Sequence, residues 1–225
     1  MGQYSKKGMY AGYDKNNKER DALDYYATPP NEVYNILKEM GFEKGNVTIL
    51  EPSCGGGHMV EGIYKYNPKA TIYATDIKQR PNPFMVRDAV GETIFYHYGD
   101  KYDYLSEEYA VYDCDMDNID YVIMNPPFSV IIPFVQHSLD IAKKGVLMFG
   151  RLQFLESVAR YEKIFQENPP TDVWVYVDRV ACYKNGIFST KPSSVQAYAW
   201  FYWDKEKIGQ GTNLKFIRAY EKSGK

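Results

Sequence analysis

A glycine-rich turn directly follows an apolar segment in the stretch Val47-Thr48-Ile49-Leu50-Glu51-Pro52-Ser53-Cys54-Gly55-Gly56-Gly57. Val47–Leu50 has the length and composition of a buried strand, and Met59–Tyr66, after the turn, has the apolar spacing of a helix. Glycines permit positive φ angles and let a ligand approach the backbone, since they have no Cβ. The N–H groups that open the next helix suit a carboxylate or a phosphate. The stretch predicts a ligand-binding turn, although a tight strand-to-helix connection explains the glycines about as well.

Strands and helices alternate on both sides of this stretch, which predicts an α/β fold with helices on both faces of a mostly parallel sheet. The expected strands are Val47–Leu50, Ala70–Ala74, Thr93–Tyr98, Ile119–Met124, Gly145–Phe149, Val173–Val177 and Val195–Trp203. The expected helices are Asn31–Met40, Met59–Tyr66, Pro133–Lys143 and Phe154–Glu167. The helix-poor end of the chain predicts an antiparallel edge to this seven-stranded sheet, with Cys182–Phe188 as a hairpin partner of the last strand. We expect one domain over residues 25–225, preceded by a flexible arm of residues 1–24.

Asp76 ends the expected strand after the glycine-rich turn and follows Gly57 by 19 residues. An acidic residue at this position can accept hydrogen bonds from both ribose hydroxyls of an adenosine. The alternative is a turn or helix cap. The glycine-rich turn and the order of the strands favour ribose binding.

The tetrapeptide Asn125-Pro126-Pro127-Phe128 directly follows the buried run Ile119–Met124. The two prolines stiffen the backbone, so the loop projects the Asn125 amide and the Pro126 carbonyl from the carboxyl edge of the sheet. Both oxygens can accept an N–H from an amino group whose nitrogen is to be methylated, and Phe128 can stack on a base. Asn-Pro and Pro-Pro are also common in loops that have no chemical role. The preceding buried strand favours the interpretation that the tetrapeptide holds an amino group.

Composition indicates a globular protein of 225 residues, with 44% hydrophobic and 25% charged residues. The net charge is −2, so the chain as a whole has no electrostatic preference for nucleic acid. The three cysteines and three histidines show no metal-ligand spacing, and Asp113–Asn118 lacks the glycine of a calcium loop, so no metal is expected. No apolar stretch is long enough to span a membrane, and we expect a cytoplasmic protein. Nothing in the sequence indicates an oligomeric state.

Several motifs together resemble class I S-adenosylmethionine (SAM) dependent methyltransferases of the adenine-N6 type, and particularly the compact enzymes of phages and prophages. The resemblance runs from about Tyr25 to about Asp204 and includes Gly150–Glu156, a stretch similar to phage-borne members. It implies a Rossmann-like methyltransferase fold, SAM as the cofactor and, for a phage-encoded chain, the bacterial host cytoplasm as the location.

The resemblance also implies the site residues. The segment with Tyr26, Thr28 and Pro29 would contact the methionine carboxylate of SAM, and the segment with Glu51, Pro52, Ser53, Cys54, Gly55 and Gly57 would wrap the methionine moiety. Asp76 would bind the ribose, with Ile77 against the adenine. Asp103 and Tyr104 match the segment that binds the SAM adenine, and Asp100 competes for that role. Asn125, Pro126, Pro127 and Phe128 would be the catalytic tetrapeptide, with Asn125 also beside the cofactor.

The sequence therefore predicts an adenine-specific methyltransferase that acts on nucleic acid. Lys184, Lys191 and the basic ends of the chain favour nucleic acid as the acceptor, and DNA is expected rather than RNA. The region for target recognition is short, Tyr183–Gln196, which indicates loose or partner-assisted recognition. Three alternatives remain: methylation of a protein glutamine amide at N5, methylation of adenine in RNA, and a SAM-binding module without turnover.

Overall fold

A computed structural model describes residues 25–80, 90–111, 114–180, 182–184 and 196–220. Eight strands form one sheet, in the order β10-β7-β9-β6-β5-β2-β3-β4. Their bounds are β2 (Thr48–Glu51), β3 (Thr71–Asp76), β4 (Ile94–Tyr98), β5 (Tyr121–Met124), β6 (Gly145–Arg151), β7 (Asp172–Tyr176), β9 (Tyr198–Asp204) and β10 (Asn213–Ile217). All neighbouring pairs are parallel except those that β9 makes with β6 and β7. The predicted α/β class with a mostly parallel sheet is confirmed.

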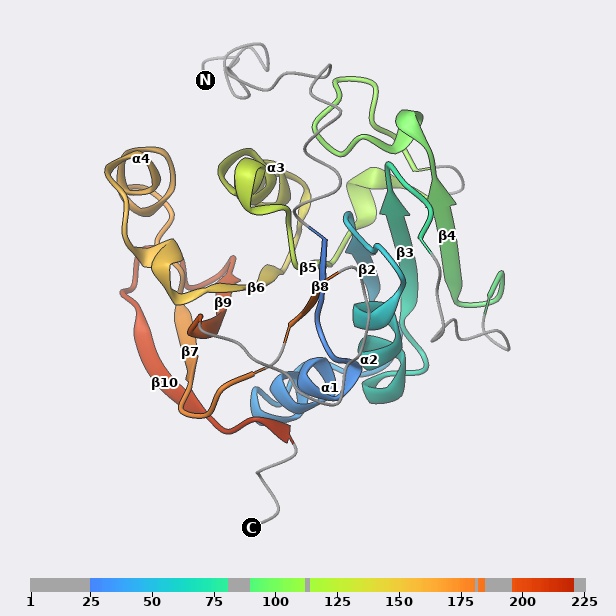
Figure 1. Cartoon of the computed structure of the whole chain (residues 1–225). Coiled ribbons are helices and arrows are strands. Elements are labelled where there is room, and N and C mark those ends of the chain that lie inside the picture. The colour runs from blue at the N-terminus through green and yellow to red at the C-terminus, as the bar shows by residue number, and fades with distance from the viewer. Residues whose placement is uncertain (1–24, 81–89, 112–113, 181, 185–195, 221–225) are drawn as a thin grey trace.

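Four α-helices cover the two faces of this sheet in the described part of the chain. They are α1 (Pro30–Glu39), α2 (His58–Tyr66), α3 (Ile131–Ile141) and the short α4 (Val158–Arg160). Figure 1 shows α1 and α2 on one side of the sheet and α3 and α4 on the other. None of the helices in the described ranges is both long and apolar enough to cross a membrane.

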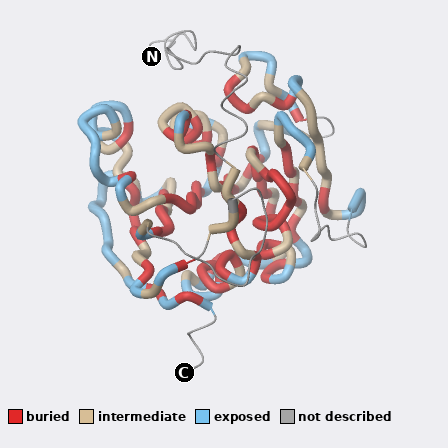
Figure 2. Tube along the Cα trace, viewed as in Figure 1, coloured by how far each residue is buried: buried red, intermediate tan, exposed pale blue. Residues whose placement is uncertain are grey.

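Two hydrophobic cores lie on the two faces of the sheet, because successive side chains of a strand point in opposite directions. In β2, Ile49 packs with the α1 and α2 side, whereas Leu50 packs with the α3 side. Figure 2 shows the buried residues gathered along the strands and the inner faces of the helices. At Gly62 a Cβ would lie 2.4 Å from the Pro30 carbonyl oxygen, so a glycine is needed where α2 packs on α1.

The order of the strands around the antiparallel β9 cannot be read from the hydrophobic pattern of the sequence. β9 lies between β6 and β7, and β10 is the outer strand of this half, parallel to β7. β10 is an eighth strand, one more than the sequence predicts. The expected hairpin with Cys182–Phe188 is wrong for the described residues, because β8 (Tyr183–Lys184) pairs antiparallel with β1 (Tyr26–Ala27) in a separate two-stranded sheet.

The expected helix Phe154–Glu167 is broken into shorter pieces. A 3₁₀ turn at Leu152–Leu155 leads into α4, and a π-helix follows at Tyr161–Phe165. Arg160 Nη1 donates hydrogen bonds to the carbonyl oxygens of Gln153 and Glu156, both at 2.8 Å, which holds the turn against the helix start. The expected arm, residues 1–24, lies outside the described residues.

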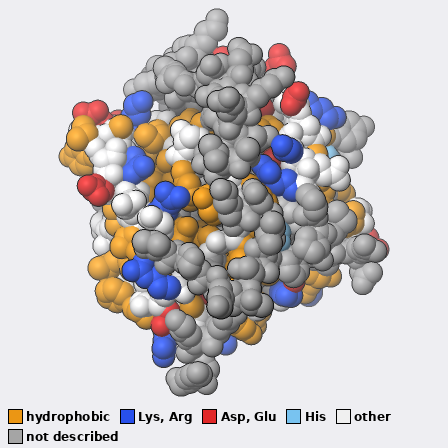
Figure 3. Space-filling model, viewed as in Figure 1, with side chains coloured by type: hydrophobic (Ala, Val, Ile, Leu, Met, Phe, Trp, Pro, Cys, Tyr) orange, Lys and Arg blue, Asp and Glu red, His pale blue; other side chains and the backbone are white. Residues whose placement is uncertain are grey.

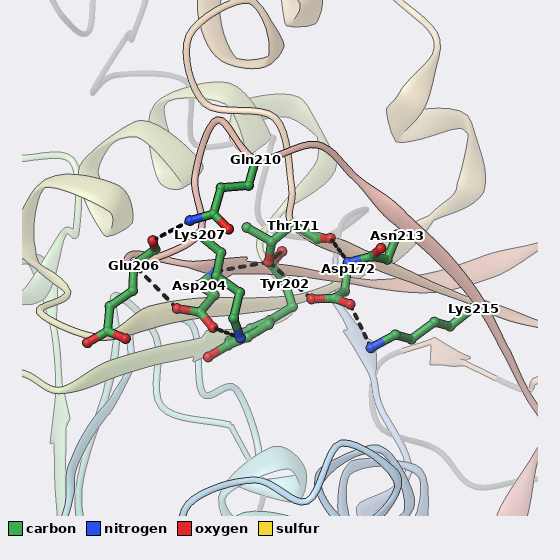
Figure 4. Close-up of polar contacts among 9 residues, drawn as sticks. All are labelled: Thr171, Asp172, Tyr202, Asp204, Glu206, Lys207, Gln210, Asn213 and Lys215. Atoms are coloured by element: carbon green, nitrogen blue, oxygen red, sulfur yellow. Dashed lines mark hydrogen bonds and ion pairs between the residues drawn. The ribbon is translucent and has the colours of Figure 1, made fainter.

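A polar network fixes the amino edge of the sheet, where β7 and β10 begin (Figure 4). Lys215 Nζ lies 2.6 Å from Asp172 Oδ1, and Thr171 Oγ1 donates to the Tyr202 carbonyl oxygen at 3.0 Å. These contacts join β7, β9 and β10 at the end of the sheet opposite to the strand ends discussed next.

Candidate functional site

The glycine-rich turn and the Asn125 tetrapeptide lie side by side at the carboxyl edge of the sheet. β2 and β5 are neighbouring parallel strands, with Ile49 opposite Tyr121 and Leu50 opposite Val122. Ser53 Oγ donates a hydrogen bond to the main-chain oxygen of Asn125 at 3.3 Å, which links the two loops directly. From β2 the chain continues outward through β3 and β4, whereas β5 and β6 lie on the other side. Ligands of open α/β sheets bind at such a point of reversal.

The glycine-rich turn adopts a conformation that other residues would strain. Gly55 has a φ of +52°, and Gly57, which precedes α2, has a φ of +76°. The ring of Tyr25 lies against Gly55, since a Cβ at Gly55 would be 2.2 Å from Tyr25 Cε2. The Gly56 N–H donates to the Tyr25 hydroxyl at 2.8 Å. Tyr25, to which the sequence resemblance assigns no role, therefore covers the turn.

Asp76 connects the end of β3 to the same turn. Its Oδ2 accepts the Gly55 N–H at 2.8 Å and its Oδ1 accepts the Lys78 N–H at 3.0 Å. A carboxylate accepts several hydrogen bonds, so its chemistry suits hydroxyl donors. Ile77, the next residue, is 42% exposed and offers an apolar surface beside this carboxylate.

The Asn125 side chain is held in one orientation by the segment before α1. Its Nδ2 donates to the Tyr26 carbonyl oxygen at 2.8 Å and to Thr28 Oγ1 at 3.0 Å. A carbonyl oxygen can only accept, so the amide nitrogen faces Tyr26 and both of its hydrogens are used. No hydrogen bond to Asn125 Oδ1 occurs within the described residues. The side-chain oxygen is therefore the atom that can accept an N–H from a ligand.

The rest of the tetrapeptide supports this arrangement. Pro126 is buried, and Pro127 has a φ of −58° and a ψ of 131° at the start of the 3₁₀ turn Phe128–Val130. The half-buried Phe128 ring lies 6.0 Å from the Tyr26 ring, centroid to centroid, at an angle of 40°. The Arg151 guanidinium lies over the Phe128 ring, with its Cζ 4.1 Å from the ring centroid.

Burial keeps most titratable groups of the turn uncharged at neutral pH. Burial raises the pKa of the Glu51 carboxyl to about 8, although the hydrogen bonds from Ser53 to Glu51 Oε1 oppose this shift. Burial also raises the pKa of the Cys54 thiol and lowers the pKa of His58 to about 4. Asp76 therefore lies at the surface of a largely neutral, enclosed turn.

The two residues expected near the SAM adenine have different surroundings. Tyr104 is 1% exposed, and its hydroxyl lies 2.9 Å from Ser138 Oγ in the core below α3. Its side chain is therefore part of the core. Asp103 is partly exposed and accepts the Leu105 N–H at 3.1 Å. Gly99 N–H donates to the Asp76 carbonyl oxygen at 3.1 Å, which places the exposed Asp100 directly after a residue bound to Asp76.

The remaining predicted residues lie close to these groups. Thr28 is 2% exposed, and Pro29 is the N-cap residue directly before α1. Pro52 is buried between Glu51 and Ser53. In the described ranges, no group of three His, Cys, Asp or Glu side chains could hold a metal ion.

No protein-family model and no curated protein matches the sequence. Solved structures do match in fold. A type I restriction-modification methyltransferase subunit from Streptococcus thermophilus is 14% identical, with a TM-score of 0.60 over 90% of this chain and 49% of that one. A putative type I modification subunit from Vibrio vulnificus is 12% identical, with a TM-score of 0.57 over 91% of this chain and 48% of that one.

A putative RNA methyltransferase from Pyrococcus horikoshii is 17% identical, with a TM-score of 0.58 over 89% of this chain and 96% of that one. The chain thus spans about half the length of the two restriction-modification subunits and nearly the whole of the archaeal protein. These likenesses show that the chain has the fold of solved methyltransferases.

Proposed function

We propose that this chain transfers a methyl group from SAM to the exocyclic N6 amino group of adenine in nucleic acid, with DNA as the acceptor. The observation that carries the proposal is the locked Asn125 amide. Its two N–H groups are held by Tyr26 and Thr28, so its oxygen is presented as an acceptor beside the glycine-rich turn. The stand-alone phage or prophage type belongs to this proposal and rests on the sequence resemblance.

The residues at the ends of β2 and β3 fit the cofactor. The turn at Gly55–Gly57 has no side chain beyond Cα, and the Asp76 carboxylate at the end of β3 is of the chemical type that accepts from ribose hydroxyls. Ile77 offers an apolar contact for the adenine, and Asp100 or Asp103 could accept from its amino group. When bound, SAM supplies a methyl group on a positively charged sulfur, which is already activated for transfer.

The acceptor chemistry follows from what the tetrapeptide can hold. The lone pair of an adenine amino group is delocalised into the ring, so the nitrogen is a poor nucleophile. Asn125 Oδ1 and the Pro126 carbonyl oxygen can each accept one N–H, which favours a pyramidal nitrogen with its lone pair directed at the methyl group. Phe128 would support the base by stacking. Positioning is the main contribution of the protein to such a reaction.

The comparisons support nucleic acid as the acceptor, since two of the similar structures are described as restriction-modification methyltransferase subunits and one as an RNA methyltransferase. The same two acceptor oxygens would also fit the NH₂ group of a glutamine side chain. The acceptor class must therefore be decided by experiment.

The test is to incubate the protein with methyl-labelled SAM and separate pools of unmethylated DNA, RNA and protein. We expect label in DNA, recovered as N6-methyladenine after digestion, and mapping in a methylation-free bacterium would give the modified positions. Label only in RNA or only in glutamine would move the acceptor to the corresponding alternative. Tight SAM binding without transfer to any pool would refute the enzymatic proposal.

A further inference from the structure

Arg151 lies next to the candidate acceptor site because of its place in the sheet. It is the last residue of β6, and β6 pairs with β5, which leads directly into Asn125. The register places Arg151 opposite Tyr198 of β9. Its guanidinium therefore lies at the same edge as the tetrapeptide, with its Cζ 4.1 Å from the centroid of the Phe128 ring.

The charge of Arg151 is not balanced by an acidic side chain of the described chain. Arg151 is partly buried and forms no ion pair there, and its Nε is buried without a hydrogen-bond partner. Arg218, in contrast, pairs with Asp178, with Arg218 Nε 3.2 Å from Asp178 Oδ2. A partly buried cation without a counter-ion is costly, so a site that retains one is suited to an anionic ligand.

Cys182 and Tyr198, which interact electrostatically with the guanidinium, are neutral at pH 7. Burial raises the pKa of Cys182 to about 12 and also raises the pKa of Tyr198, and the positive charge of Arg151 offsets these shifts only in part. Phe128 contributes the face of its ring, which attracts a cation but carries no net charge. The face seen in Figure 3 shows exposed hydrophobic side chains with Lys and Arg side chains beside them.

We propose that Arg151 binds the backbone phosphate of the target nucleotide, so that the site accepts a nucleic acid and not a protein amide. A nucleotide combines a planar base, for stacking on Phe128, with an anion, for pairing with the guanidinium. A glutamine side chain offers neither. This inference rests on the proposed function and specifies the substrate class of the same site.

The test compares Arg151→Met, Arg151→Lys and Arg218→Met in binding a fluorescein-labelled single-stranded DNA with one adenine among thymines. A single strand avoids the cost of extracting the base from a duplex. Met keeps the apolar contact with Phe128 but removes the charge, whereas Lys keeps the charge but loses the planar fork. Arg218→Met removes an arginine that already has an acidic partner.

We expect Arg151→Met to weaken oligonucleotide binding at least about ten-fold and to reduce the slope of log Kd against log salt by about 0.7, the value for one phosphate contact on a single strand. Arg151→Lys should retain the salt slope, and Arg218→Met should match the wild type. Replacing the phosphate beside the adenine with an uncharged methylphosphonate should weaken binding to the wild type but not to Arg151→Met.

An unchanged Kd and salt slope in Arg151→Met, with its thermal stability and SAM affinity at wild-type values, would overturn the inference. A purely structural role for Arg151 would instead alter stability and leave the salt slope unchanged, which would also overturn it. Failure of the wild type to methylate any nucleic acid would refute the proposed function. The binding measurement needs no turnover, so it still decides the role of Arg151.

Discussion

Replacing Asn125 with alanine tests the proposed chemistry most directly. The substitution removes two hydrogen bonds, from Nδ2 to the Tyr26 carbonyl oxygen at 2.8 Å and to Thr28 Oγ1 at 3.0 Å. A hydrogen bond contributes about 0.5–1.5 kcal/mol net, so we expect the free energy of unfolding to fall by about 1–3 kcal/mol. The chain should remain folded, because the loss is smaller than the stability of a typical domain.

The same substitution removes the oxygen that would hold one N–H of the acceptor. Loss of one preorganised hydrogen-bond partner in a transition state typically lowers kcat by about 10²–10³, and we expect a fall of this size. SAM affinity should change by less than about three-fold, or about 0.7 kcal/mol, because the turn and Asp76 are untouched. Label transfer from SAM to unmethylated DNA gives kcat, and calorimetry gives the SAM affinity.

Asn213→Ala is the matched control. Asn213 Nδ2 donates to the Thr171 carbonyl oxygen at 3.3 Å, at the amino edge of the sheet (Figure 4), so its removal should leave kcat unchanged. Transfer to adenine at the wild-type rate by Asn125→Ala would refute the reasoning. A parallel loss of SAM binding and activity would show instead that Asn125 supports the fold of the turn and does not act on the acceptor.

Burial raises the pKa of Glu51 from 4.5 to about 8, so the folded chain keeps a proton that the unfolded chain releases, and stability should fall as the pH rises through this window. In urea unfolding from about pH 5 to about pH 9, the free energy of unfolding of Glu51→Gln should rise relative to that of the wild type up to about pH 8, and the difference should then stay constant. Burial lowers the pKa of His58 from 6.5 to about 4, so the wild type should lose stability as the pH falls between these values, and His58→Gln should lack that loss in the same assay. Gly55→Ala should lose about 1–3 kcal/mol more than Gly41→Ala, because overpacking adds to the strain of a positive φ. A Cβ at Gly55 meets Tyr25 at 2.2 Å and one at Gly41 meets nothing within 4 Å, so adding Tyr25→Ala to Gly55→Ala should recover part of the difference in chemical denaturation.

The central part of the fold could be predicted because buried parallel strands are continuous apolar runs. The run at Ile119–Met124 contains β5, and the apolar segment before the glycine-rich turn contains most of β2. The turn and the residues at the strand ends then follow from chain order, since parallel strands bring their carboxyl ends to one edge. Local pattern was sufficient to locate these buried strands along the chain.

Strands at the side of the sheet were harder to predict because their pairing is not local. β10 was not expected, and its Leu214 and Phe216 are 61% and 64% exposed, so its apolar residues do not indicate which face is buried. The pairing of β8 with β1 joins segments more than 150 residues apart, for example Tyr26 with Lys184. The sequences of β1 and β8, each only two residues long, do not indicate that these strands pair with one another.

In the candidate site too, the sequence indicated which residues take part but not how they are arranged in space. The sequence indicated Asn125 and Asp76, but the orientation of the Asn125 amide depends on Tyr26, 99 residues away. Arg151 was noted only within a similar stretch, and its contact with Phe128 arises from the register between β5 and β6. A basic residue at the end of a buried strand beside the strand that leads into the tetrapeptide was the signal that could have indicated it.

The segment Tyr25–Thr28 holds both the glycine-rich turn and the Asn125 tetrapeptide. Tyr25 accepts from Gly56, while Tyr26 and Thr28 accept from Asn125, so one four-residue segment contacts both loops. The segment is itself held by its pairing with β8. A displacement of Tyr25 from the turn would therefore move the carbonyl group that orients the Asn125 amide. Under the proposed function, residues outside the two motifs, with no reactive groups of their own, would therefore set the position of the glycine-rich turn relative to the tetrapeptide.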